Sequence, residues 1–556
     1  MIKLTALELE NFQTIEKHTV VPIRNLTLMF GPNGAGKSSI YDALDLLKII
    51  FSEDWGEKSK KLSDLLERWA SNKQVNKSLG VGLQFYVDKN WDLKGMYNLF
   101  NLDDLYKIHT ASIQNNYKNE FCNQTFRVFI EFSKAQGDYH WIISNLNISN
   151  YTKQILSLDT KLPKDNLTCN RVQVFKQDWI DFDAIDKSLD IKKAKIDNIE
   201  YFELFYGRYL DEIDTRKWFA DTSLCQTERY LKDRDAHNAA EEIVCQIIDF
   251  FKILINNSMD WGSNELIGLI PGSRTVPSPS ELIFLISGST WLNGSPGKRK
   301  IIPPQIISHQ SILIETRNRL NPELTEWEKI AANYAKDKCA EPSDNLKDYW
   351  DENSITTKIN SLLSEELFLE QGYQISGEVK CLVNIEELIE FNTSESITYP
   401  KLVNLFLIGP NGKRVEIDDV GSGIGYVLPV LSSLAATGIS LIQQPELHLH
   451  PALQSALGTA IVKCVENKKD YNAFTLIETH SEHILLRIMR LLKNAKARDE
   501  EVITPIDFEN VAILYFQPKG DGATIIKRLR LSPDGQLVDR WPGGFFEERY
   551  KDIFDA

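Results

Sequence analysis

The first fifty residues alternate between the two periods that distinguish strands from helices. The run Leu26–Phe30 is almost continuously apolar, which is typical of a short buried strand. From Ile40 to Phe51, apolar residues recur at i, i+3, i+4, i+7 and i+11, which places them on one face of a helix. A Gly-rich turn lies between the two. We therefore expect a strand, a turn, a strand, a Gly-rich loop and a helix over residues 2–51.

Strand patterns continue after this unit and return near the end of the chain. Segments such as 81–87 and 126–132 are rich in β-branched and aromatic residues and predict strands. From about residue 376 onward, strand and helix patterns alternate, and the last strands are expected at about 511–516 and 524–531. Both ends of the chain therefore carry the alternation of an α/β protein.

The middle of the chain has a different pattern. The spacing of apolar residues predicts helix at about 185–257 and again at about 310–370. The charged run 190–195 is expected on a solvated helical face. Residues 271–304 are rich in Pro, Gly and Ser and predict loops around a short strand at 282–286.

These patterns predict an α/β fold in three parts. Residues 1–180 form an N-terminal lobe, residues 181–375 a mostly helical insertion, and residues 376–556 a C-terminal lobe. A length of 556 residues is enough for two to four domains.

Composition limits the cellular locations and the partners expected for this protein. No apolar run is long enough to span a bilayer, and the N-terminus lacks the apolar core of a signal peptide. The seven cysteines are scattered and form no C-x-x-C pair, so we expect reduced thiols, a cytoplasmic location and no membrane partner. A net charge of −15 argues against coating of DNA by the whole surface, although a local basic groove stays compatible with it.

Residues 31–38, GPNGAGKS, form a complete phosphate-binding loop between the predicted strand and helix. Backbone N–H groups and the positive end of the helix dipole converge on phosphate oxygens in such a turn. Lys37 is expected to reach the β- and γ-phosphates, and Ser38 to hold Mg²⁺. The residues predicted to contact the nucleotide here are Asn33, Gly34, Ala35, Gly36, Lys37, Ser38 and Ser39.

A second group of polar residues follows the apolar segment 440–442, which predicts a buried strand. Gln443 and Gln444 come directly after it, and Glu446 lies two residues further on. A P-loop ATPase places its Walker B residues at this point, where they hold Mg²⁺ and orient the attacking water. We therefore expect Gln443 and Gln444 to lie at the nucleotide.

Two further segments complete the candidate site. Another buried strand is predicted at 473–477, and a histidine just beyond it, His480, is placed to sense the γ-phosphate. Gly421, Ser422 and Gly423 form a Gly/Ser turn that opens an apolar helix, which is a second candidate anion site.

Four motifs occur in a fixed order along the chain: GPNGAGKSS, DDVGSGIGYVLPVL, QQPELHLHP and IETHSEHILLR. Together they resemble the ABC-type ATPases related to RecF, SMC and the OLD (overcoming lysogenisation defect) proteins. The resemblance implies an ABC-type P-loop head that binds ATP and is assembled from both chain ends, with the insertion as a helical or coiled-coil arm. It also implies head-to-head dimers, in which Ser422 and Gly423 of one subunit face the nucleotide of the other.

OLD proteins typically continue into a Toprim nuclease domain, whereas this sequence shows no acidic cluster of that kind after 524–531. It is more similar to the ATPase subunit of Septu antiphage systems, which works with a separate HNH nuclease and occurs in some retron operons. Residues 270–277 also resemble that group. The expected partners are therefore a second copy of the chain, a separate nuclease, and DNA or retron nucleic acid as a further candidate.

The sequence departs from the family where Gln443 and Gln444 replace the usual carboxylates. A glutamine amide forms hydrogen bonds but does not accept a proton usefully, so we expect slow or absent hydrolysis. Glu446 and His480 are the candidate catalytic residues, and Glu446 or Glu478 could substitute for the missing carboxylates.

Alternative interpretations are kept open. The chain could be a RecF-like repair ATPase that clamps DNA, or a true turnover enzyme with Glu446 as its base. Residues 409–413 imitate the phosphate loop but predict a hairpin turn. The aromatic residues around Trp541 predict either a docking patch or a clasp on the core.

Overall fold

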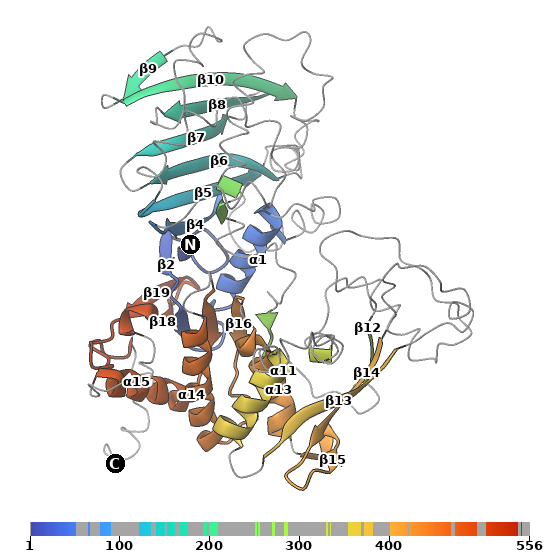
Figure 1. Cartoon of the computed structure of the whole chain (residues 1–556). Coiled ribbons are helices and arrows are strands. Elements are labelled where there is room, and N and C mark those ends of the chain that lie inside the picture. Colours follow the sequence, from blue (N-terminus) through green and yellow to red (C-terminus); the bar gives the residue numbers. More distant parts are fainter. Residues whose placement is uncertain are drawn as a thin grey trace, which may run out of the picture.

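The computed structural model describes residues 2–51, 65–66, 78–89, 122–134, 141–150, 153–161, 167–175, 193–196, 199–209, 251–252, 254–255, 269–272, 283–286, 330–331, 334, 354–368, 372–381, 401–420, 422–436, 438–468, 473–496, 507–542 and 546. Three β-sheets form the framework of these residues (Figure 1).

A six-stranded sheet joins the two ends of the chain. Its strands, in spatial order, are β11 (Leu269–Ile270), β16 (Ser440–Gln443), β17 (Thr475–Glu478), β3 (Leu26–Phe30), β18 (Val511–Pro518) and β19 (Thr524–Leu529). All neighbours are parallel except β18 and β19, which are antiparallel. Because β3 lies between two strands from the C-terminal part, the predicted α/β head assembled from both chain ends is confirmed.

Helices cover both faces of this sheet. Helix α1 (Ser39–Phe51) packs on one face, and α13 (Ser422–Ala435), α14 (Pro451–Asn467) and α15 (Glu482–Lys496) pack on the other. Successive strand residues face opposite sides, so in β17 Leu476 joins the α1 side of the core while Ile477 joins the other side. Burial on both faces explains why these strands are continuously apolar in the sequence.

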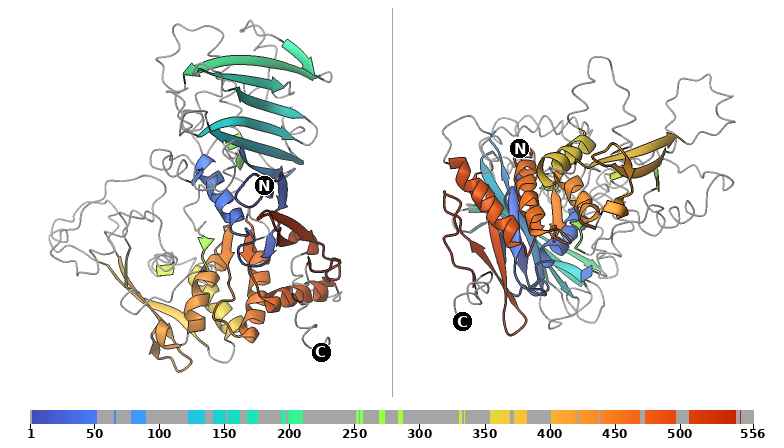
Figure 2. Two further views of the ribbon diagram at one scale, coloured as in Figure 1. Left: turned by 180° about the vertical axis from the view of Figure 1, so that it is seen from behind. Right: turned by 90° about the horizontal axis from the view of Figure 1, so that it is seen from below.

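A nine-stranded antiparallel sheet stands at the other end of the molecule (Figures 1 and 2). Its strands, in spatial order, are β2 (Thr19–Pro22), β1 (Ile2–Glu10), β4 (Leu79–Val87), β5 (Gln124–Lys134), β6 (Trp141–Asn150), β7 (Gln154–Lys161), β8 (Leu167–Phe175), β10 (Ile199–Tyr209) and β9 (Lys193–Ile196). The strands predicted at 81–87 and 126–132 are confirmed as parts of β4 and β5.

The prediction of helix from about 185 to 257 is wrong in its first part. Strands β9 and β10 occupy 193–196 and 199–209, so residues 193–195 of the charged run belong to a strand and not to a helix; residues 190–192 lie outside the described residues. Edge strands tolerate lysines, because charge discourages pairing with another chain. Further along, Phe251 is helical and buried against Phe126; most of 210–268 lies outside the described residues. The division at residues 180 and 375 stays a prediction.

A smaller sheet contains β12 (Ile283–Ile286), β14 (Lys401–Ile408), β13 (Gln374–Cys381) and β15 (Arg414–Val415). The strand predicted at 282–286 is confirmed as β12. Helix is confirmed at the end of 310–370, where α11 (Ile355–Ser361) leads into the π-helix η6 (Leu362–Leu367).

Two local predictions concern turns and the C-terminal aromatic residues. Residues 409–413 form the predicted hairpin turn, with the Gly409 N–H donating to the Lys413 carbonyl at 2.9 Å. Trp541 packs edge-on against Phe30 with ring centroids 5.3 Å apart, so it is a clasp on the core of the head. Among the described helices, none combines the length and apolar character needed to cross a membrane.

Candidate functional site

The loop 31–38 connects β3 to α1 at the carboxyl edge of the six-stranded sheet. Gly31 and Gly36 have φ values of +144° and +78°. A Cβ at Gly36 would lie 2.1 Å from Thr14 Oγ1, and one at Gly31 would lie 2.5 Å from the Phe516 carbonyl oxygen. Glycine is therefore required both for the backbone conformation and for the close approach of neighbouring chain.

The Lys37 side chain lies at the centre of this edge and is buried. Its Nζ donates to the carbonyl oxygens of Gly31 and Pro32, each at 2.9 Å, and lies 3.6 Å from Glu478 Oε1. Burial lowers the pKa of Lys37, although the nearby Glu478 carboxylate acts in the opposite direction. In this state the lysine is held by its own loop and by one carboxylate.

The two serines after Lys37 face different environments. Ser38 is exposed at the start of α1, where a phosphate-bound cation can reach its hydroxyl. Ser39 is fully buried, and its hydroxyl donates to Gln13 Oε1 at 2.5 Å. The Gln13 amide in turn donates to Asp42 Oδ2 at 2.6 Å. Ser39 therefore anchors the loop to the turn between β1 and β2.

The other predicted loop residues divide in the same way. Asn33 and Gly34 are exposed, whereas Ala35 is buried and its carbonyl accepts a hydrogen bond from Thr524 Oγ1 at 3.0 Å. Asn33 and Gly34 of the loop are therefore exposed to solvent, whereas Ala35 is bonded to β19.

Strands β16 and β17 end beside this loop with Gln443 and Glu478 in register. Gln443 Oε1 accepts a hydrogen bond from the Gly272 N–H at 3.3 Å. The backbone of Gln444 turns here with φ +45°, and its N–H donates to the Glu478 carbonyl at 2.7 Å. A Cβ at Gly272 would lie 3.0 Å from Gln444 Oε1, so both glutamine side chains lie against the segment after β11.

Glu478 is the carboxylate nearest to Lys37 among the described contacts. Oε1 faces Lys37, and Oε2 is buried with no hydrogen-bond partner. Burial raises the pKa of Glu478, and the Lys37 charge partly offsets this. Both partners of this ion pair are therefore shifted toward their neutral forms, as expected for ionisable groups removed from water.

Glu446, a candidate catalytic residue, accepts a hydrogen bond at each carboxylate oxygen from the segment that contains His480. Its Oε2 accepts from Thr479 Oγ1 and its Oε1 accepts from the His480 N–H, both at 2.8 Å. These bonds tie the loop after β16 to the loop after β17. The His480 Nε2 atom is buried and has no hydrogen-bond partner within the described part of the chain. Burial, and to a smaller extent the Lys37 charge, lowers the pKa of this imidazole.

Tyr41 was missed in the sequence, because it lies beside the apolar stripe of α1 and carries no motif. Its hydroxyl donates to the Ile442 carbonyl at 2.9 Å and accepts from the Glu478 N–H at 3.0 Å. Burial raises the pKa of Tyr41 well above its usual range, so the hydroxyl stays protonated. Through Tyr41, the helix that follows the phosphate loop is bonded to both strand ends.

The predicted signature segment opens α13. Gly421 lies outside the described residues, and Ser422 and Gly423 are the first two residues of the helix. A Cβ at Gly423 would lie 3.5 Å from the His448 carbonyl oxygen, and the rings of Tyr426 and His448 are 4.1 Å apart. The start of α13 therefore lies against the segment that follows the two glutamines.

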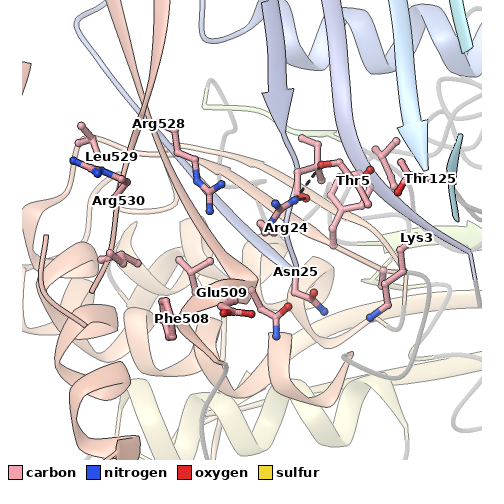
Figure 3. Close-up of a pocket in the computed structure, with 17 residues that line it drawn as sticks. Lys3, Thr5, Arg24, Asn25, Thr125, Phe508, Glu509, Arg528, Leu529 and Arg530 are labelled. Atoms are coloured by element: carbon pink, nitrogen blue, oxygen red, sulfur yellow. Dashed lines mark hydrogen bonds between the residues drawn. The ribbon is translucent and has the colours of Figure 1, made fainter. Parts of the chain in front are cut away.

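A separate cavity of about 780 Å³ lies at the opposite, amino edge of the same sheet. Figure 3 shows Lys3, Arg24 and Arg528 around it, with Glu509 on one wall. The Arg24 Nη1 atom donates to the carbonyls of Thr5 and Ile23 at 3.2 and 2.9 Å, which fixes its guanidinium in the wall. We call this cavity, defined by Lys3, Arg24 and Arg528, the basic cleft.

Two family models match this chain. Residues 2–485 match the family described as "AAA ATPase domain". The chain belongs to this family. Residues 506–555, which include β18, β19 and Trp541, match a family described as "Protein of unknown function (DUF3696)".

Three relatives share shorter stretches. The chain is 25% identical over 175 residues to Structural maintenance of chromosomes protein 1 of Caenorhabditis elegans, covering 31% of this chain and 12% of that protein. It is 40% identical over 73 residues to Chromosome partition protein Smc of Gloeobacter violaceus, covering 13% and 6%. It is 23% identical over 243 residues to DNA replication and repair protein RecF of Shewanella pealeana, covering 40% and 64%. The chain spans less than two thirds of each relative's length.

Solved structures of Smc heads are similar over most of the chain. An Smc head bound to the C-winged helix domain of ScpA has a TM-score of 0.38 at 11% identity and covers 95% of this chain and 98% of that chain. The SMC head domain from Thermotoga maritima has a TM-score of 0.34 at 9% identity, covering 95% and 100%. The family match and the relatives make this chain an ATP-binding, ABC-type ATPase related to SMC and RecF proteins. The likeness to Septu ATPases stays a prediction.

Proposed function

We propose that this chain is a nucleotide-controlled switch, in which ATP with Mg²⁺ closes two heads against each other. The position of Lys37 is the observation that carries this function. Its Nζ is held by two carbonyls of its own loop and by Glu478, and a bound triphosphate offers a stronger, charged partner. Because Tyr41 bonds the Glu478 backbone to α1, a change at Lys37 reaches both strand ends.

In the closed dimer, Ser422 and Gly423 of each subunit face the nucleotide held by the partner, as the family motif implies. When bound, Mg²⁺ would supply charge neutralisation at the β- and γ-phosphates, and Ser38, which is exposed just before α1, would hold it. Gln443 and Gln444 are neutral and lie against Gly272, and Glu446 accepts hydrogen bonds at both oxygens. These residues therefore favour slow hydrolysis and a long-lived closed state.

Dimer closure can be tested with a variant that leaves the monomer intact. A Cβ at Gly423 makes only ordinary van der Waals contacts, so Gly423→Ala fits within one head. We expect this variant to bind ATP normally but to lose ATP-dependent dimerisation, measured by sedimentation with and without ATP and Mg²⁺. Gly520→Ala, where a Cβ has nothing within 4 Å, is the matched control. Wild-type protein that stays monomeric with ATP would contradict the switch.

We further propose that the closed dimer regulates a separate HNH-type nuclease in antiphage defence. The order of the four motifs and their likeness to Septu ATPases support this role. The chain alone is then expected to leave DNA intact, and to change the activity of the nuclease encoded beside it in an ATP-dependent way. DNA cleavage by the purified chain without a partner would remove this role.

A second candidate is a DNA clamp, and the basic cleft favours it. Two relatives are named for chromosome partition and for DNA replication and repair. In a chain of net charge −15, Lys3, Arg24 and Arg528 concentrate positive charge at one edge of the head. The clamp predicts that the chain binds DNA only with ATP. It also predicts that the slope of log binding constant against log salt concentration becomes shallower by about two ion contacts in Lys3→Gln/Arg528→Gln. Lys527→Gln, next to the cleft on β19, is the control.

A further inference from the structure

The end of β17 carries a buried carboxylate with one oxygen unaccounted for. Glu478 Oε1 lies 3.6 Å from Lys37 Nζ, which is longer than a hydrogen bond, and Oε2 has no hydrogen-bond partner among the residues that the structure describes. Buried polar groups are nearly always hydrogen-bonded, and an ionised one is the most costly to leave unmet. Pairing with Lys37 uses only Oε1 of Glu478, so the ion pair does not explain why Oε2 is buried without a hydrogen bond.

The position of Glu478 on the sheet gives its second oxygen a purpose. Register partners on parallel strands point to the same face, so Gln443 and Glu478 project side by side toward α1. Leu476, two residues earlier, and Met29, the partner of Glu478 on β3, belong to the α1 side of the core. Glu478 therefore stands on the strand next to the phosphate-loop strand, one strand closer than Gln443.

The donor type also fits the cation that accompanies ATP. Mg²⁺ prefers oxygen ligands and is usually held by one or two carboxylates together with phosphates and water. Gln443 offers an amide oxygen that already accepts from Gly272, and both oxygens of Glu446 accept hydrogen bonds. Among these three side chains, only Glu478 combines a negative charge with an oxygen that has no hydrogen bond.

We propose that Glu478 supplies from β17 the carboxylate that β16 lacks, and that it binds the Mg²⁺ of bound ATP directly or through its water shell. The assignment rests on the proposed function only in requiring ATP at the phosphate loop. When Lys37 turns to the phosphates of bound ATP, Glu478 loses the lysine ammonium as its neighbour and gains Mg²⁺. Compared with the usual carboxylate at the end of β16, Glu478 lies one strand closer to β3, at the same edge and on the same face of the sheet.

The test separates metal binding from ATP binding. ATP affinity is titrated with Mg²⁺ and with EDTA in the wild-type chain, in Glu478→Gln and in Gln443→Asp/Glu478→Gln, and Mn²⁺ bound with ATP is followed by electron paramagnetic resonance. We expect Glu478→Gln to lose at least about tenfold in the gain that metal gives to ATP affinity, with affinity in EDTA kept or increased. We expect Gln443→Asp to restore the metal effect, because it returns a carboxylate one strand away.

Each other result has a distinct meaning. An unchanged metal effect in Glu478→Gln overturns the assignment, as does a loss of affinity that is equal with Mg²⁺ and with EDTA. Glu365→Gln, which neutralises an exposed carboxylate on η6 away from the site, is the control and is expected to keep the metal effect. Thermal unfolding checks that each variant is folded. Absence of ATP binding in the wild-type chain would instead contradict the proposed switch, so the two failures are distinguishable.

Discussion

Strands β16 and β17 run side by side in the same direction and end at the same edge, yet their ends differ in charge. β16 ends in neutral amides that lie against Gly272, on the side of the short strand β11. β17 ends in Glu478, which faces Lys37 of the phosphate loop. The difference follows strand order, because β17 adjoins β3 whereas β16 does not. The charge therefore lies at the end of a strand that adjoins β3, the strand leading into the phosphate loop.

The largest expected effect comes from removing the cation that β17 faces. Lys37→Ala deletes a charged donor to the phosphates and leaves Glu478 buried without a counter-ion. We expect ATP affinity to fall at least about 100-fold, measured by isothermal titration calorimetry, because several charge-assisted hydrogen bonds are lost together. Lys527→Ala, on an exposed position of β19, is the control. Retained affinity would place the phosphates elsewhere.

Tyr41→Phe tests the bond that joins the two strand ends. The change leaves the Ile442 carbonyl and the Glu478 N–H buried without the hydroxyl. We expect the free energy of unfolding to fall by about 1–2 kcal/mol in urea titrations, because the two buried hydrogen bonds of the hydroxyl are lost while both backbone groups remain in the β16–β17 ladder. Tyr86→Phe removes an exposed hydroxyl bonded to Asn123 and is expected to cost less than about 0.5 kcal/mol. Equal effects of the two changes would show that Tyr41 does not couple the strands.

Restoring carboxylates to β16 tests whether its neutral end limits hydrolysis. We expect Gln443→Asp/Gln444→Glu to raise phosphate release about tenfold or more, because a carboxylate can orient and deprotonate water whereas an amide cannot. The same release assay on Glu446→Gln is expected to show little change, since both Glu446 oxygens hold the loop at His480. A large loss in Glu446→Gln would instead make Glu446 the base.

The smallest effect concerns the other end of β16. Lys468 Nζ donates to Ser440 Oγ at 2.7 Å, and burial lowers the pKa of Lys468 to about 8. Above pH 8 the unfolded chain binds more protons than the folded one, so the free energy of unfolding rises with pH, by up to about 1.4 kcal/mol per unit. Burial raises the pKa of Cys464 to about 11, which opposes this rise above pH 9.

Denaturant titrations at pH 8 and pH 9 measure that slope, and Lys468→Met is expected to remove it. A variant that keeps the same slope would assign the pH dependence to other groups. The first residues of the two strands differ in this respect. Ser440 of β16 accepts a hydrogen bond from a lysine, whereas for Thr475 of β17 the described contacts include a bond from its N–H to the Asn25 carbonyl and none with a lysine.

Local patterns were enough to predict the elements of the head. The apolar run of β3, the stripe of α1 and the polar residues after β16 are each written within about a dozen neighbouring residues, so their periods are readable. The missed strands β9 and β10 show the limit. A charged run beside aromatic residues suits an exposed helix or an edge strand equally well, and only pairing with β8 decides between them.

The contacts of the candidate site were less predictable than its residues. Lys37, Gln443 and His480 stand out through motifs, but the sequence does not give the order of strands in the sheet. The approach of Glu478 to Lys37 depends on that order, because β17 inserts between β16 and β3. Tyr41 is bonded to atoms of the main chain, and such partners leave no mark in the sequence.

The interleaving of the two chain ends has a consequence for synthesis on the ribosome. Tyr41 and its partner Glu478 are separated by 437 residues. At translation rates of roughly 5–20 residues per second, the phosphate loop waits on the order of 20–90 seconds for the strands that flank it. During that interval β3 has neither of its sheet neighbours, so the nascent N-terminus is a predicted client for chaperones until the last strands emerge.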